Sequence, residues 1–65
     1  MDELGFEAGQ IEGRHWMTEI LKSHKRYTAF EMYQERMKER AGIRGLSAFD
    51  KGFFAGADEV LRSHE

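Results

Sequence analysis

The stretch that decides the fold is "GFEAGQIEG", residues 5–13, in which three glycines follow one another at intervals of four residues. A similar phrase, "GFFAG", occupies residues 52–56. Each glycine inside a helix costs about 1 kcal/mol relative to alanine, whereas small residues four apart let two helix backbones approach closely. We therefore expect the two segments to pack on each other, or on copies of themselves in a second subunit. The residues expected in this contact are Phe6, Gly9, Gly13, Phe53 and Gly56.

The composition indicates a single all-α domain that spans residues 1–65, because the chain has no proline, few β-branched residues and many helix formers. At this length an isolated hydrophobic core is marginal. The absence of cysteine excludes disulfides and suits a reducing, cytoplasmic environment. The net charge of −2 favours neither nucleic acid nor an anionic membrane as partner. The acidic start, "MDELGF", and the lack of a long apolar stretch lead us to expect no signal peptide and no membrane partner.

Hydrophobic periodicity predicts three helices, at about residues 2–23, 29–41 and 48–62, arranged as a three-helix hairpin or bundle. Thr28 is followed three residues later by a glutamate, which is the pattern of a capping box at the start of the second helix. Ser47 is the expected N-cap of the third helix. These signals place two short connections between three helices.

The apolar load is large for three short helices, because five Phe, one Trp, two Tyr and four Met occur in one small chain. Two of the predicted helices carry two apolar rows each, and one row of each pair has no place inside a monomer. We therefore expect a homo-oligomer, most simply a dimer, that buries the remaining rows. The rows are Leu4–Ala8–Ile11 and Phe6–Met17–Ile20 in the first helix, and Phe49–Phe53–Val60 and Phe54–Ala57–Leu61 in the third.

The most basic stretch is "KSHKRY", residues 22–27. Cations combined with aromatic rings bind nucleotides and single-stranded nucleic acids, so this stretch is a candidate binding site. The alternative interpretation is a cationic helix end that complements its own dipole. The candidate partner- or ligand-binding residues are Lys22, Lys25, Arg26, Tyr27 and the nearby Trp16.

Glu12, His15 and Glu19 share one face of the first predicted helix, and Glu-x-x-His is part of the ligand set of di-iron bundles. A complete site needs a second motif and further carboxylates, and the alternative is a solvated helix face. We expect no metal and no cofactor. We also expect no enzyme, because the sequence has no cysteine nucleophile, no phosphate-binding glycine loop and no convincing Ser–His–acid arrangement.

The segment "ERAGIRGLSAFDKG", residues 39–52, resembles the turn of a phage-repressor type helix-turn-helix, in which an Ala-Gly-Ile step precedes the recognition helix. The spacing from Ile43 to Leu46 is two residues shorter than in that family, which deletes positions that normally touch bases. Arg44 alone remains there. The resemblance implies a DNA-binding regulator as one alternative, with Arg44 as a candidate contact.

As a whole, the small helical chain without cysteine or proline is similar in style to the small accessory proteins of bacteriophages and other mobile elements. That resemblance implies a protein that binds and redirects or inhibits a host protein, often as a dimer or larger oligomer. We therefore predict a non-enzymatic binding protein, a phage-type inhibitor or modulator of a host or defence protein, which acts as a homo-oligomer in the host cytoplasm. Two alternatives stay open: an oligomer that sequesters a phosphorylated small ligand such as a nucleotide, and the DNA-binding regulator.

Overall fold

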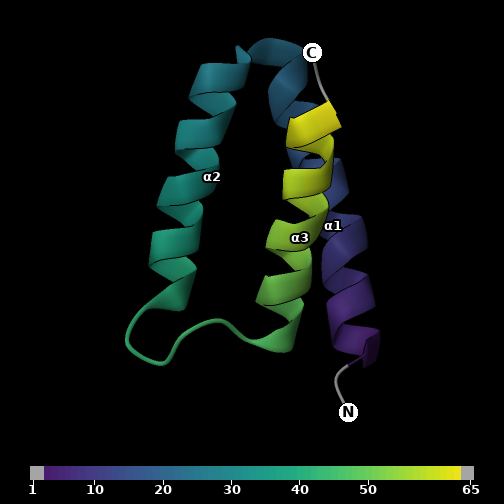
Figure 1. Cartoon of the computed structure of the whole chain (residues 1–65), viewed down its shortest axis with the longest axis vertical. Coiled ribbons are helices and arrows are strands. Elements are labelled where there is room, and N and C mark those ends of the chain that lie inside the picture. The colour runs from purple at the N-terminus through teal and green to yellow at the C-terminus, as the bar shows by residue number, and fades with distance from the viewer. Residues whose placement is uncertain (1–2, 64–65) are drawn as a thin grey trace.

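The computed structural model describes residues 3–63, and every regular element within them is a helix. Helix α1 spans Glu3–Ser23, α2 spans Arg26–Ala41 and α3 spans Ala48–Ser63. Figure 1 shows that α1 and α3 run side by side in the same direction, while α2 returns antiparallel to both and stands apart. The all-α prediction is confirmed for this part of the chain; the predicted first residue of the first helix lies outside it. None of the described helices is long and apolar enough to cross a bilayer.

The contact between α1 and α3 is made by backbones. A Cβ built on the buried Gly9 would overlap the carbonyl oxygen of Phe49 and lie 2.8 Å from the backbone nitrogen of Phe53. A Cβ on the buried Gly13 would overlap the carbonyl oxygen of Phe53 and lie 2.6 Å from its carbonyl carbon. Real Cβ atoms essentially never come within 3.0 Å of another atom in this way. At this separation of the two helices, only glycine fits either position.

The same relation holds in the opposite direction across this contact. Gly52 and Gly56 of α3 are buried. A Cβ on Gly52 would overlap the carbonyl oxygen of Phe6, and one on Gly56 would overlap that of Gln10. Each helix therefore lays its carbonyl groups over the glycines of the other, and the contact is reciprocal.

Both similar phrases take part in this contact. Gly9 of the first phrase lies against the backbone nitrogen of Phe53, and Gly52 of the second lies against the carbonyl of Phe6. A Cβ on Gly5 would meet nothing closer than 3.9 Å, which is ordinary van der Waals contact. Gly5 therefore differs from the glycines that a side chain would push out of the contact.

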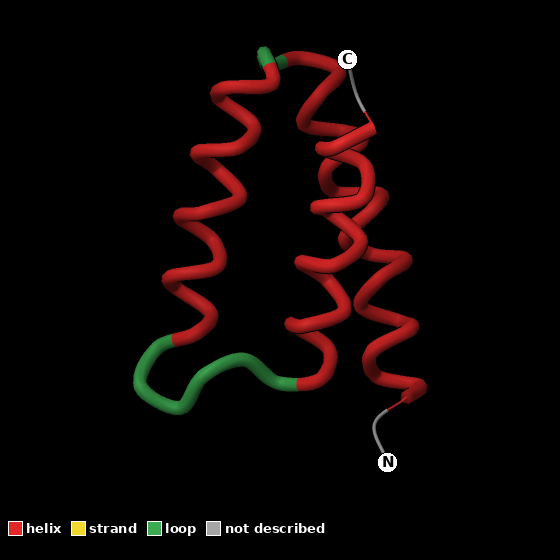
Figure 2. Tube along the Cα trace, viewed as in Figure 1, coloured by secondary structure: helices red, strands yellow, loops and turns green. Residues whose placement is uncertain are grey.

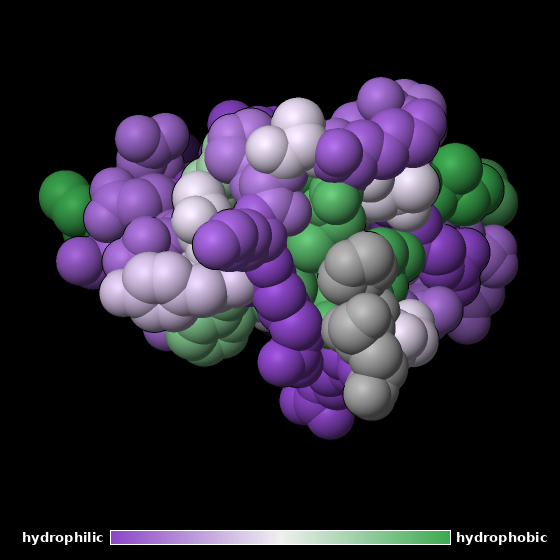
Figure 3. All heavy atoms as spheres, turned by 90° about the horizontal axis from the view of Figure 1, so that it is seen from above, coloured by the Kyte–Doolittle hydropathy of each residue, from purple (hydrophilic) through white to green (hydrophobic). Residues whose placement is uncertain are grey.

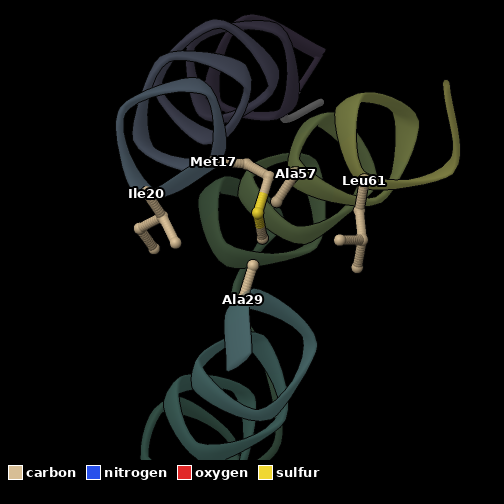
Figure 4. Packing of buried hydrophobic residues seen from close by; sticks show 5 residues of the cluster. All are labelled: Met17, Ile20, Ala29, Ala57 and Leu61. Atoms are coloured by element: carbon tan, nitrogen blue, oxygen red, sulfur yellow. The ribbon is translucent and has the colours of Figure 1, made fainter. Parts of the chain in front are cut away.

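The small hydrophobic core lies where all three helices meet. Met17 is fully buried, and Figure 4 shows its side chain between α3 and Ala29 of α2. Ile20, Ala57 and Leu61 complete the cluster. Ala29 is the one buried residue of α2. Met32 and Tyr33 of α2 are partly buried and also pack against this cluster. Contacts outside the cluster supply the rest of the attachment of α2.

Aromatic contacts supply part of that attachment. Arg36 of α2 lies over the rings of Trp16 and Phe53, with its guanidinium carbon 5.1 Å and 4.6 Å from the two ring centroids. These rings are themselves in contact, with centroids 5.2 Å apart. Tyr33 packs edge-on against Phe54 at 5.5 Å. An arginine and a tyrosine thus join the middle of α2 to the α1–α3 pair.

Arginine hydrogen bonds fix the two ends of α2. At its start, Nε of Arg26 donates to the carbonyl oxygen of Leu61 at 3.1 Å, in the last turn of α3 where carbonyls lack intrahelical partners. At its end, Nε of Arg40 donates to the carboxylate of Asp50 at 3.0 Å. The backbone N–H of Asp50 donates to the hydroxyl oxygen of Ser47 at 3.1 Å, which confirms the predicted N-cap of α3.

The start of α2 differs from the prediction. The helix begins at Arg26, and its N-cap is Lys25, which has an extended backbone and no side-chain capping hydrogen bond. Thr28 lies inside the first turn, so the capping-box interpretation is wrong. The physical reason is tertiary: only His24 and Lys25 separate α1 from α2, and the hydrogen bond from Arg26 to Leu61 joins the first turn of α2 to α3.

Candidate interaction surfaces

Helix α2 carries a row of mainly apolar side chains beside its inward face. Tyr27 is 72% exposed and Phe30 45%, while Met37 and Ala41 are half-buried and Gln34 is exposed between them. The steps between these positions alternate between three and four residues, so they form one stripe along the helix. We call this stripe the α2 seam; its members are Tyr27, Phe30, Gln34, Met37 and Ala41.

A groove of about 510 Å³ runs between the N-terminal half of the α2 seam and the end of α3. Arg62 on its rim pairs with Asp58 at 2.8 Å, which leaves Arg26 as the cation without a carboxylate among the lining residues. Aromatic rings and arginines around an apolar floor are the residue types that dominate protein-binding hot spots. The lining residues are Arg26, Tyr27 and Phe30 from α2, and Asp58, Leu61 and Arg62 from α3.

A second and more open hollow, of about 790 Å³, follows the C-terminal half of the α2 seam. Here the seam residues are Gln34, Met37 and Ala41, which are smaller or more flexible than the rings at the other end. Glutamates and a lysine surround them. The lining residues are Glu31, Gln34, Glu35, Met37, Lys38 and Ala41.

The structure brings together only part of the predicted basic site. Arg26 and Tyr27 share the groove. Lys22 instead pairs with Glu19 at 2.9 Å, and this ion pair lowers the pKa of the Glu19 carboxyl below its ordinary value. Lys25 is exposed at the N-cap of α2. Sequence reasoning missed the α3 side of the groove, and it missed Phe30, although its spacing of three residues from Tyr27 was a usable signal.

The other two predicted binding residues lie elsewhere. The ring of Trp16 is covered by Arg36 and packed on Phe53, so it belongs to the attachment of α2. Arg44 lies in the connection between α2 and α3, which Figure 2 shows at the opposite end of the molecule from the α1–α2 turn. These two residues therefore do not share a site with the basic stretch.

A second apolar row is exposed on α1. Leu4 is 82% exposed and Ile11 62%, with Ala8 also exposed between them. All three members of this row are therefore exposed in the described part of the single chain. On α3, Phe49 of one predicted row is 40% exposed, although Phe53 of that row is buried, and the row of Phe54, Ala57 and Leu61 is buried within the chain. The reason is that α3 lies between the other two helices and packs against both.

The described residues hold no group of three or more side chains placed to bind a metal. Glu12 and His15 are exposed on α1, and Glu19 is occupied by its lysine partner. The segment that resembles a helix-turn-helix also lacks that geometry. Its second helix, α3, runs antiparallel to α2 and buries residues 52–54 and 56–57 against its neighbours. A recognition helix needs a free face that projects into the major groove.

Hydrophilic residues cover most of the face in Figure 3, which looks onto the end formed by the α1–α2 turn, with hydrophobic residues showing between them. Comparison of the chain with protein-family models, curated proteins and solved structures gave no match. The candidate interaction surfaces of the chain are the α2 seam, its groove and the exposed row of α1.

Proposed function

We propose that this chain is a non-enzymatic helical binding protein that acts as a homo-oligomer, with one apolar surface for its own copy and another for a different polypeptide. The observation that carries the proposal is the presence of two separate exposed apolar surfaces, the α2 seam and the α1 row of Leu4, Ala8 and Ile11. Contiguous apolar patches of this kind mark interaction sites on soluble proteins.

The scaffold in this proposal is the glycine-mediated packing of α1 on α3. Four buried glycines allow the backbones of α1 and α3 to meet. The two helices therefore form a stable pair in which their outer faces do not have to pack into the core. Those outer faces are then free to carry recognition residues. The hydrophobic core expected at this length is marginal, so association with another chain would add stability to the domain.

The partner surface in this proposal is the α1 row. Exposed carboxylates of Glu7 and Glu12 border the apolar side chains of Leu4 and Ile11. A polypeptide with an apolar face and a basic rim complements such a surface. By its resemblance to the accessory proteins of bacteriophages and mobile elements, we infer that this partner is a host protein whose activity the chain inhibits or modulates in the cytoplasm.

Position-specific photocrosslinking in the host cell tests the proposal. A benzophenone side chain at Ile11 should give one dominant adduct with a different polypeptide, and Leu4→Glu should abolish that adduct. The control is the same probe at Lys51, which is exposed on the outer side of α3. Equal adducts from both positions, or none from Ile11, would contradict the assignment of the α1 row.

A second candidate function is the sequestration of a phosphorylated small ligand, such as a nucleotide, between subunits. The groove favours it, since Arg26 and Arg62 lie beside the rings of Tyr27 and Phe30, and arginine forks bind phosphates while aromatic rings stack on bases. Calorimetric titration with ATP at low salt distinguishes the two functions. Binding that Tyr27→Ala abolishes would favour the ligand, and no measurable heat would exclude ATP.

A further inference from the structure

We infer that the α2 seam is the self-association surface and that it pairs antiparallel with the α2 seam of a second copy of this chain. This inference rests on the homo-oligomer of the proposed function and names its surface and geometry. The spacing of the seam is the first argument. Residues 27, 30, 34, 37 and 41 occupy the alternating three- and four-residue positions of a coiled-coil core.

Length favours the α2 seam over the α1 row as the self-association surface. From Tyr27 to Ala41 the seam extends along about 21 Å of helix, whereas Leu4 to Ile11 covers about 10 Å. A standard protein–protein interface buries roughly 800 Å² on each partner, and in a symmetric pairing of two identical rows the longer seam supplies more of that area than the shorter α1 row. The seam also continues into the groove beside α3, where a second helix would contact Leu61.

The sizes of the seam side chains indicate the antiparallel direction. Its first half ends in protruding rings, and its second half borders the open hollow at Met37 and Ala41. An antiparallel pairing centred on Gln34 places the rings of Tyr27 and Phe30 of each copy over the half of the seam that holds the smaller side chains of the other copy. A parallel pairing would oppose ring to ring at one end and leave the alanines apart at the other, which close packing disfavours.

Charge and polarity indicate the same direction and register. Glu31 and Lys38 lie on either side of Gln34, and no salt bridge is formed by either one within the described residues. In the antiparallel pairing, Glu31 of one copy faces Lys38 of the other, which gives two pairs of opposite charges related by the two-fold axis. Gln34 then lies at the two-fold axis. A polar side chain at a core position specifies register, and an amide both donates and accepts hydrogen bonds.

Disulfide trapping tests this geometry cleanly, because the chain has no cysteine of its own. Gln34→Cys should give a disulfide-linked dimer under mild oxidation, since its two copies meet at the axis. A mixture of Tyr27→Cys and Ala41→Cys chains should give the mixed disulfide, with little of either homodimer, because a disulfide needs Cα atoms within about 7 Å. Ile11→Cys and Lys51→Cys are the matched exposed controls and should remain monomeric.

Other outcomes separate this inference from the proposed function. A Tyr27→Cys homodimer would overturn the antiparallel direction. Trapping at Ile11→Cys alone would overturn the α2 seam while leaving the homo-oligomer in place. A monomeric mass for the unmodified chain would overturn both.

A charge exchange gives a second readout that does not need oxidation. Glu31→Lys places like charges together twice across the two-fold axis, so the dimer dissociation constant should rise about fivefold. Adding Lys38→Glu to the same chain should restore it. An unchanged dissociation constant in the single variant, or no recovery in the double one, would overturn the proposed register.

Discussion

The α1–α3 contact and the attachment of α2 join helices by different means. The first brings backbones together at four glycines, where no side chain fits. The second relies on one buried alanine, the partly buried Met32, an edge-on contact between the rings of Tyr33 and Phe54, and three arginines. The comparison shows that close backbone packing at glycines can hold two helices of a small chain together. The third helix, α2, is attached through a few side chains, so much of its surface stays out of contact. We expect the two regions to respond differently to mutation and pH.

The largest effect is expected at the backbone contact. Gly13→Ala places a methyl group on the carbonyl of Phe53, so the helices have to separate, and the free energy of unfolding should fall by about 3 kcal/mol. Gly5→Ala is the matched control, because its Cβ has room; stability should stay unchanged or rise by up to about 1 kcal/mol. Thermal denaturation followed by circular dichroism measures both. Similar melting temperatures for the two variants would refute the difference in packing.

The next effect concerns the ion pair between Arg40 of α2 and Asp50 of α3. Burial raises the pKa of Asp50, but the hydrogen bonds from Arg40 and Ser47 lower it by more, so the net pKa lies below the ordinary 3.8. The folded pKa is therefore depressed. The ionised carboxylate stabilises the fold above about pH 4, and this contribution is lost as the pH falls through the folded pKa.

Asp50→Ala should accordingly lower the free energy of unfolding by about 2 kcal/mol at pH 7, and by progressively less below pH 4. Asp58→Ala is the control, since its pair with Arg62 is exposed and should contribute less than about 0.5 kcal/mol. Urea titrations at several pH values give the comparison. If Asp50→Ala lowered the free energy of unfolding by the same amount at every pH, the proposed contribution of the Arg40–Asp50 ion pair would be contradicted.

A smaller and more local effect is expected at Arg36. Arg36→Met removes the guanidinium from the rings of Trp16 and Phe53, which costs about 1 kcal/mol. Amide hydrogen exchange should accelerate about fivefold in α2, while amides at the α1–α3 contact keep their protection. Arg44→Met, in the exposed connection, should change neither region. Equal acceleration in all three helices would mean that α2 is not a separate unit.

The smallest expected effect concerns Thr28 and Ser47, two hydroxyl residues that the sequence predicts as helix N-caps. Thr28→Ala should change the free energy of unfolding by less than about 0.5 kcal/mol, because Thr28 lies inside α2 and caps nothing. Ser47→Ala removes the acceptor for the backbone N–H of Asp50 and should cost about 1 kcal/mol. Equal denaturation midpoints for the two variants would contradict the observed helix starts.

The periodic parts of the fold could be predicted from the sequence. Glycines at helical spacing marked α1 and α3, and Ser47 marked the start of α3, because both signals are local. The start of α2 could not be predicted, since the hydrogen bond that places it joins Arg26 to a carbonyl 35 residues away.

The candidate surfaces were predictable only in part. Tyr27 and Arg26 were found because they lie in one basic stretch, but the wall of the groove at Leu61 and Arg62 comes from the other end of the chain. The position of Trp16 under the guanidinium of Arg36 was not predicted, because that arginine lies 20 residues later on another helix. Periodicity was enough to predict the exposed row of α1, whereas on α3 the position between two helices decided that Phe53 and Phe54, one from each row, are both buried.

Multi-angle light scattering of the unmodified chain at micromolar concentration tests the central claim most directly. The account predicts twice the 7.6 kDa mass of one chain, with a melting temperature that rises as the protein concentration is raised. A mass of 7.6 kDa together with a cooperative melt that does not depend on concentration would contradict it.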